Sequence, residues 1–254
     1  MRNALIGHTG FVGGNLAAQM RFDEVYNSSN ISELPERSFD LLVCAGAPGA
    51  KWRANQDPAL DRASIACLQS ALQRVEARRC VLVSTVDVFP DPVGIDEHSA
   101  ISPEGGSAYG RHRRELEECV AARFEHALIV RLPGLFGPGL KKNVIYDFLN
   151  QNNLERIDSR AVYQFYDLRR IAQDVNLCLA ANLRLVHFAT EPVSVKEIAA
   201  RAFGRTFTQV LAAAAPRYDM RTCHAHVFGH SGAYISTRED VLNQITDFVR
   251  EERA

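Results

Sequence analysis

Short apolar runs alternate with longer segments of helical periodicity along the 254-residue chain. This alternation predicts an α/β fold with a parallel sheet, because each crossover helix returns the chain to the same edge of the sheet. The predicted strands cover 4–6, 24–26, 39–44, 80–84, 127–132 and 183–189, with a further extended segment at 161–168. The predicted helices cover 13–20, 57–76, 108–123, 141–152, 170–181, 193–202 and 237–250.

The composition is typical of a globular protein and gives no sign of a nucleic-acid or membrane partner. Hydrophobic residues make up 46% of the chain and charged residues 23%, which is ordinary for a globular protein. The net charge of −1 indicates no nucleic-acid or membrane partner. Six cysteines without a C-x-x-C pair predict free thiols in a reducing compartment. With no signal peptide or bilayer-long apolar stretch, the sequence predicts a cytoplasmic protein.

A glycine-rich turn follows the first predicted strand and opens the first predicted helix. Its spacing is G-x-x-G-x-x-G, and it reads Gly7-His8-Thr9-Gly10-Phe11-Val12-Gly13. Such a turn lets backbone N–H groups approach a pyrophosphate, which then lies at the positive end of the helix. The predicted cofactor-binding residues of the turn are Gly7, Thr9, Gly10, Phe11, Val12 and Gly13.

The end of the second strand bears on which dinucleotide is bound. An acidic residue there would repel a 2′-phosphate, but the segment 26–30 carries only neutral side chains. This slightly favours NADP over NAD, although a simple turn explains the same residues equally well. We expect Asn27 and Ser28 to contact the adenosine side, and the small residues Ala45, Gly46 and Ala47 to let the backbone approach the cofactor.

Several further segments, in this order and spacing, resemble the extended short-chain dehydrogenase/reductases, which include nucleotide-sugar epimerases, dehydratases and 4-ketoreductases. They are the runs 83–89, 109–113, 130–139, 165–168 and 191–195. The run Ser-Thr-x-x-Val-Phe-Pro at 84–90 is especially similar to the dTDP-4-dehydrorhamnose reductases. The resemblance implies a Rossmann-type doubly wound sheet over 1–137 and 167–190. It also implies a small C-terminal substrate-binding lobe over 138–166 and 191–254.

The resemblance assigns catalytic roles to three residues. It implies that Thr85 bonds the reacting sugar oxygen and that Tyr109 donates or accepts the proton. The family carries a lysine one helical turn after this tyrosine, where the present chain has Arg113. A guanidinium keeps the positive charge but differs in shape from an ammonium, so the exchange bears directly on activity. Pro133 and Gly134 are expected to orient the nicotinamide carboxamide.

The expected substrate contacts are Thr85, Asp87, Lys142 and Asn143, the last two following a Gly-Pro-Gly turn. Asp87 corresponds to an acid of the dehydratases, but Val86 replaces their second acid, which argues against 4,6-dehydration. The resemblance thus implies an NAD(P)-dependent reductase of a keto group on a nucleotide-linked sugar. An epimerase with retained NAD and a catalytically weak NAD(P)-binding sensor are the alternatives. A homodimer through helices 57–76 and 108–123 is also expected.

A cluster of histidines near the C-terminus suggests a metal site at first sight. His224, His226 and His230 lie close together in the sequence, beside Cys223. Their spacing matches no familiar zinc arrangement and lacks a partnering set of ligands. The sequence therefore predicts surface histidines and no metal.

Overall fold

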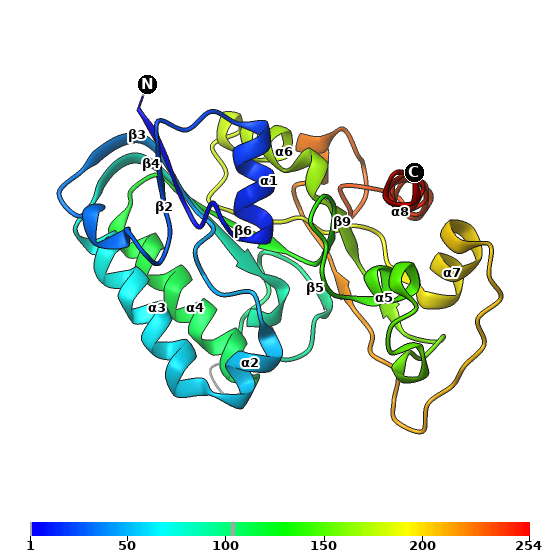
Figure 1. Ribbon diagram of the computed structural model, residues 1–254. Helices are drawn as coiled ribbons and strands as arrows, with labels where there is room; N and C mark the ends of the chain where they lie inside the picture. The colour runs from blue at the N-terminus through cyan, green and yellow to red at the C-terminus, as the bar shows by residue number, and fades with distance from the viewer. Residues whose placement is uncertain (1, 103–104) are drawn as a thin grey trace. The chain divides into compact units, whose positions relative to one another are not determined.

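The computed structural model, which describes residues 2–102 and 105–254, contains a six-stranded parallel sheet (Figure 1). The strand order is β10-β6-β4-β3-β1-β2, so the order reverses between β1 and β3. The six strands are β1 (Asn3–Ile6), β2 (Glu24–Tyr26), β3 (Ser38–Cys44), β4 (Glu76–Thr85), β6 (Ala127–Leu132) and β10 (Leu185–His187). The predicted α/β class with a Rossmann-type sheet is confirmed.

Helices cover both faces of this sheet. The pair α1 (Phe11–Gln19) and α6 (Ile171–Ala180) lies on one face, and α3 (Pro58–Gln73) and α4 (Ala108–Arg123) lie on the other (Figure 1). Along β3 successive side chains point to opposite faces, and consecutive apolar residues are buried, so both faces of the strand are apolar. Leu42 is buried in the cluster with α3 and α4, whereas its neighbour Val43 is buried outside that cluster. The homodimer expected through α3 and α4 stays a prediction.

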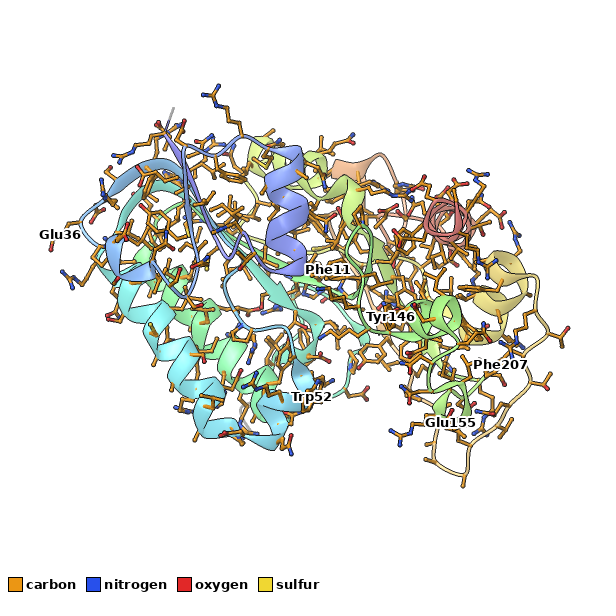
Figure 2. The ribbon with its side chains drawn as sticks, viewed as in Figure 1. Phe11, Glu36, Trp52, Tyr146, Glu155 and Phe207 are labelled. Carbon is orange, nitrogen blue, oxygen red and sulfur yellow. The ribbon has the colours of Figure 1, made fainter. Side chains whose placement is uncertain are left out.

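The two helices that frame the site begin at side-chain caps. Asp57 accepts the N–H of Leu60 at the start of α3, and Ser107 accepts the N–H of Gly110 at the start of α4. The predicted helix 57–76 was wrong at its end: α3 stops at Gln73, because Glu76 already pairs with β3 as the first residue of β4. The helix α2 (Lys51–Gln56) was not predicted; its Trp52 is 67% exposed (Figure 2).

The chain divides into two compact units. The first comprises Met1–Asp91, Ser99–Arg131 and Ile171–Val186, and the second comprises Pro92–His98, Leu132–Arg170 and His187–Ala254. The second therefore includes a short segment from the first half of the chain. The domain boundaries expected from the sequence stay a prediction.

Small two-stranded sheets and three helices build the second unit. The strand pairs are β7 (Gly134–Phe136) with β9 (Phe165–Asp167), β8 (Val162–Tyr163) with β11 (Val193–Ser194), and β5 (Val93–Ile95) with β12 (Asp219–Met220). The helices are α5 (Val144–Asn150), α7 (Val195–Phe203) and α8 (Arg238–Arg253). Phe148 of α5 packs against Phe203 and Phe207, at ring-centroid distances of 5.1 Å each. This aromatic contact belongs to the unit's own apolar core.

Short 3-10 helices complete the secondary structure; they are Ile31–Glu33, Val86–Val88, Leu154–Arg156, Leu168–Arg170 and Ala225–Phe228. Among the described residues, no helix combines the length and the apolar character that crossing a membrane requires.

Candidate active site

The glycine turn is packed so tightly that two of its positions leave no room for a side chain. Gly7 has a φ of 90°, and a Cβ there would lie 2.4 Å from the carbonyl oxygen of Ala45. A Cβ on Gly13 would lie 2.0 Å from the carbonyl oxygen of Gly7. Both distances are well inside van der Waals contact, so glycine is required for the turn and for its approach to the loop after β3.

The N-terminus of α1 is left open by the same turn. Gly10 is the N-cap and has no side chain that could bond the N–H groups of the first turn. No acidic residue lies in that turn. Thr9 is exposed, and Phe11 and Val12 are half-buried. The open, uncompensated positive end of a helix favours an anion such as a phosphate.

Three candidate segments follow the carboxyl ends of neighbouring parallel strands. Gly7 follows β1, Ala45 follows β3, and Thr85 ends β4. The N–H of Ala45 donates to the carbonyl of Ile6 at 2.9 Å, which joins the first two segments directly. Ligands of open α/β sheets bind at this edge, where the strand order reverses, as it does here between β1 and β3.

The segment after β2 is organised by its own side chains. The N–H and hydroxyl of Ser29 both donate to Oδ1 of Asn27, at 2.8 and 2.6 Å. The N–H of Asn27 in turn donates to Oδ1 of Asn30 at 2.7 Å. Ser28 is exposed. These bonds account for the two asparagines as turn residues, and the adenosine contacts expected of Asn27 and Ser28 stay predictions.

Tyr109 and Thr85 come together at the start of α4. The two side chains are hydrogen-bonded, and the Tyr109 ring is buried. The close approach depends on Gly110, where a Cβ would lie 1.9 Å from the carbonyl oxygen of Asp87. The N–H of Tyr109 donates to Oδ1 of Asn55 at 3.1 Å, which fixes the first turn of the helix. The structure thus brings two of the three predicted catalytic residues into contact.

Arg113, the third, lies against the ring of Tyr109. The centre of its guanidinium is 3.9 Å from the ring centroid, in a cation–π contact. The guanidinium donates to the carboxylate of Asp61 and to the carbonyl of Pro48. Arg113 is only 3% exposed, and its Nε has no partner among the described residues. A buried donor left without a partner is unusual and marks a place where a ligand atom would be stabilised.

Asp61 supplies the counter-charge for this buried cation. The same Oδ2 atom that accepts from Arg113 also lies 2.7 Å from Nδ1 of His112. Asp61 and His112 are both almost fully buried, between α3 and α4. Hydrogen bonds to Arg113 and His112 hold the pKa of Asp61 below its ordinary value, against the opposing effect of burial. The carboxylate is therefore ionised and balances the guanidinium.

The surroundings keep the phenol of Tyr109 protonated. Burial raises its pKa and outweighs the nearby Arg113 guanidinium, which lowers it. Asp87 also raises this pKa, and the hydrogen bond to Thr85 and the charge of Lys51 lower it. Lys51 and Asp87 form an ion pair of their own at 2.7 Å. At neutral pH the phenol can therefore donate a proton.

Asp61→Asn is expected to lower the free energy of unfolding by about 1–3 kcal/mol, because the buried guanidinium loses its counter-charge while an amide oxygen still accepts one bond. Chemical denaturation measures this change. Glu115→Gln is the matched control, since Glu115 pairs with Arg62 across the same two helices but on the surface. We expect it to change stability by less than about 1 kcal/mol. Equal effects of the two substitutions would contradict the assigned role of Asp61.

Sequence reasoning missed Asp61, His112 and Lys51. Asp61 lies 52 residues from Arg113 in sequence and on a different helix. An acidic residue in the first turn of an amphipathic helix usually faces solvent, so the sequence alone gives no indication that Asp61 is buried. Only the packing of α3 against α4 shows that the carboxylate points inward.

The remaining predicted residues belong to the second unit. Pro133 is buried, and Gly134 begins β7 with no space for a Cβ, which would lie 2.7 Å from the carbonyl oxygen of Gln164. Asn143 caps α5: it accepts from the N–H of Ile145 at 2.9 Å and donates to the carbonyl of Leu135 at 2.8 Å. Partial burial lowers the pKa of Lys142. The ligand contacts expected of these residues stay predictions.

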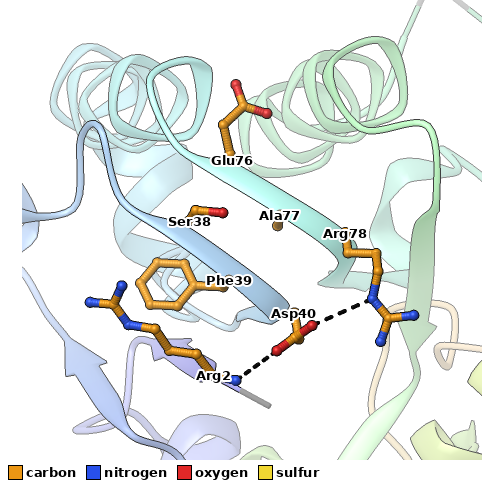
Figure 3. A pocket seen from close by; sticks show the side chains of 7 residues that line it. All are labelled: Arg2, Ser38, Phe39, Asp40, Glu76, Ala77 and Arg78. Carbon is orange, nitrogen blue, oxygen red and sulfur yellow. Dashed lines mark hydrogen bonds and ion pairs between the residues drawn. The ribbon is translucent and has the colours of Figure 1, made fainter.

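An open hollow of about 410 Å³ lies at the opposite edge of the sheet (Figure 3). Ser38 and Glu76, the first residues of β3 and β4, help to line it. Asp40 accepts the N–H of Arg2 at 2.8 Å and pairs with Arg78 at 3.6 Å. These are surface contacts at the amino ends of the strands, and none of the candidate catalytic residues lines the hollow.

No protein-family model matches the sequence. A search of curated proteins gives no significant match either.

Solved structures, in contrast, resemble the chain over its whole length. The dTDP-4-dehydrorhamnose reductase from Bacillus anthracis in complex with NADP is 17% identical, with a TM-score of 0.73 and 98% of each chain covered. The UDP-glucose 4-epimerase from Thermotoga maritima with UDP-glucose is 11% identical, with a TM-score of 0.74 over 100% of this chain and 99% of that one.

The Bordetella bronchiseptica enzyme WbmG in complex with NAD has a TM-score of 0.76 at 17% identity, over 99% of this chain and 94% of that one. At such low identities these likenesses establish the fold alone. The chain therefore has the fold of the extended short-chain dehydrogenase/reductases, as the order and spacing of its sequence motifs implied.

Proposed function

We propose that the chain is an NAD(P)-dependent oxidoreductase that reduces a keto group of a nucleotide-linked sugar. The observation that carries this proposal is the buried, protonated phenol of Tyr109. It is hydrogen-bonded to Thr85, covered by Arg113, and lies in the same unit as the glycine turn. The solved structures with this fold include a reductase with NADP and an epimerase with UDP-glucose, which supports the cofactor and substrate class.

The residues present fit a dinucleotide. The open N-terminus of α1 suits a pyrophosphate, and the crowded glycines Gly7 and Gly13 leave the backbone free to approach it. The partnerless Nε of Arg113 suits a ribose hydroxyl. In the proposal Asn27 and Ser28 lie on the adenosine side. The loop residues Ala45, Gly46 and Ala47 line the site, and Pro133 and Gly134 contact the nicotinamide. When bound, the reduced nicotinamide supplies the hydride for the carbonyl carbon.

The chain's own residues donate the proton, orient the substrate oxygen and stabilise the phenolate that forms. Reduction of a ketone places a proton on the oxygen, and Tyr109 donates it from its phenol. The Thr85 hydroxyl bonds the same substrate oxygen and so orients it toward the phenol. The guanidinium of Arg113 then stabilises the phenolate that is left. Because Asp61 holds that guanidinium in place, Arg113 can take the part that a lysine plays in the family.

The proposed substrate contacts beyond Thr85 are Asp87, Lys142 and Asn143. The carboxylate of Asp87 is already paired with Lys51, so it would act together with that cation. Lys142 would attract the diphosphate of a sugar nucleotide.

Thermal unfolding in the presence of NAD, NADP and UDP- or dTDP-sugars tests the proposal. A ligand of the native state at 100 times its dissociation constant stabilises that state by about 2.7 kcal/mol. We expect a rise in melting temperature with NADP or NAD, and consumption of NADPH with a keto sugar. The absence of any shift with both dinucleotides at millimolar concentration would overturn the proposal. Release of a dinucleotide on heating the purified protein would instead favour an epimerase that retains its cofactor.

Gly13→Ala is expected to weaken dinucleotide binding at least about tenfold, equivalent to 1.4 kcal/mol. The added methyl would lie 2.0 Å from the carbonyl oxygen of Gly7, so the turn must open. Gly14→Ala is the matched control one residue later, where the added methyl lies at an ordinary contact of 3.6 Å from the carbonyl oxygen of His8. Titration of protein fluorescence with NADPH compares the two. If Gly13→Ala binds as tightly as Gly14→Ala, the turn is not the pyrophosphate site.

A further inference from the structure

Three side chains with different metal-binding chemistry meet in the second unit. They are the carboxylate of Glu97, the thiol of Cys223 and the imidazole of His224, and one ligand atom from each lies within 4.8 Å of the other two. Glu97 follows β5, and Cys223 and His224 follow β12. The pairing of these two strands brings together residues that are 126 positions apart in the sequence.

The carboxylate of Glu97 is held in one orientation by its neighbours. Its Oε1 accepts the N–H of His187 at 2.8 Å and the hydroxyl of Thr222 at 2.6 Å. Its Oε2 accepts the N–H of Cys223 at 2.9 Å. Hydrogen bonds of this kind orient the carboxylate ligands of metal sites.

The thiol of Cys223 is already placed as a second ligand would be. Its Sγ donates to Oε2 of Glu97 at 3.2 Å. A tetrahedral zinc ion holds sulfur at about 2.3 Å and carboxylate oxygen at about 2.0 Å, which sets those two atoms about 3.5 Å apart. The observed separation of 3.2 Å is close to this value, so the thiol and the carboxylate need to move little to bind an ion. Cys223 is exposed and His224 half-buried, so an ion can reach the cluster from solvent.

We propose that Glu97, Cys223 and His224 bind a divalent ion of the zinc class. Thiolate and imidazole select zinc and its neighbours over magnesium or calcium, which prefer oxygen ligands. On binding, the Cys223 S–H bond breaks, the sulfur–metal bond forms, and one proton is released to solvent. The three bonds from His187, Thr222 and the Cys223 N–H remain and hold the carboxylate in place.

One coordination position remains for water or a further side chain. His226 is the neighbouring candidate, with its ring centroid 6.3 Å from that of His224. The expectation of no metal was drawn from Cys223 and the neighbouring histidines, and their spacing gives no sign of Glu97, which lies 126 positions earlier. The proposal does not depend on the function of the first unit.

Cobalt(II) is a suitable probe, because its bond to a thiolate gives a charge-transfer absorption band that its bonds to nitrogen and oxygen do not. We expect metal-free protein to develop this band with one equivalent of cobalt, and added zinc to abolish it. Cys223→Ser is expected to remove the band. Cys67→Ser is the matched control, because Cys67 is the other exposed cysteine of the described residues and lies outside the cluster.

Two further variants test the other ligands. His224→Ala leaves the hydrogen bonds of Glu97 intact and is expected to weaken cobalt binding at least tenfold. Glu97→Gln is expected to do the same, provided that thermal unfolding shows the variant to be folded.

The proposal is overturned if no band forms, if the band persists in Cys223→Ser, or if His224→Ala binds cobalt as tightly as the parent protein. Dinucleotide binding, measured on the same variants, should be unchanged. Failure of the metal site and failure of the proposed oxidoreductase function are therefore separate outcomes.

Discussion

Tyr109→Phe is expected to lower the rate of keto-sugar reduction by about 10²–10⁴-fold, the usual contribution of a positioned general acid. The substitution removes only the hydroxyl, so the ring contact with Arg113 remains and dinucleotide affinity should change by no more than about twofold. Consumption of NADPH, followed by its absorbance, measures the first quantity, and fluorescence titration measures the second. A rate within a few-fold of the parent's would show that another group donates the proton.

The pH dependence of the parent enzyme checks the same assignment. The proton donor must be protonated, and burial raises the pKa of Tyr109 above its ordinary value. We therefore expect the rate of reduction to persist through neutral pH and to fall only as the pH rises through this elevated pKa. Tyr234→Phe is a suitable control. Tyr234 also has a raised pKa, about 12, but its hydroxyl donates to Asp219 in the second unit. The high-pH limb should stay in place in this variant.

Glu117→Ala is expected to lower the free energy of unfolding by about 3–5 kcal/mol, because it leaves a buried arginine without its counter-charge. Glu117 is fully buried on α4. It accepts from Nε of Arg131 at 2.9 Å, from a terminal nitrogen of the same guanidinium at 2.7 Å, and from the Ser84 hydroxyl at 2.6 Å. Arg131 is 2% exposed on β6, so water cannot replace the lost carboxylate. Denaturant unfolding measures the loss.

Two variants show whether the loss comes from this buried pair. Glu118→Ala removes the next carboxylate along α4, whose ion pair with Arg114 is on the surface, and is expected to cost less than about 1 kcal/mol. The double variant Glu117→Leu with Arg131→Met replaces both charges by apolar groups and should recover most of the loss. A loss below about 1 kcal/mol in Glu117→Ala would mean that Arg131 finds another partner.

The sequence predicted all six strands of the main sheet, although β4 begins at Glu76 rather than at residue 80 and β10, predicted over 183–189, is only Leu185–His187. The strand over 24–26, the strand over 127–132 and the helix over 108–123 have the predicted bounds. The helix after Asp57 was predicted to run too far, because Val75 continues its apolar spacing while the chain already turns toward β4. The helix α2 went unpredicted because six residues give too little periodicity.

The sequence predicted the site residues that lie in short local motifs, but not their partners from distant parts of the chain. Thr85 and Tyr109 lie in short motifs, each next to the element that positions it, and the structure places them in contact. Asp61 and Glu97 act on partners 52 and 126 positions away, and neither lies in a recognisable motif. These long-range contacts depend on how the helices pack and the strands pair, and a single sequence does not reveal that arrangement.

The hydrogen bond from Arg113 to the carbonyl of Pro48 connects the catalytic cation to a loop of the sheet. Pro48, whose carbonyl accepts that bond, lies in the loop after β3. The same loop begins at Ala45, whose carbonyl abuts Gly7. One short stretch of backbone therefore links the glycine turn to the guanidinium that packs against the Tyr109 ring. If a dinucleotide binds in the glycine turn as proposed, it lies against the same loop that bonds the Arg113 guanidinium, so the cofactor and the cation beside the proton donor share one structural support.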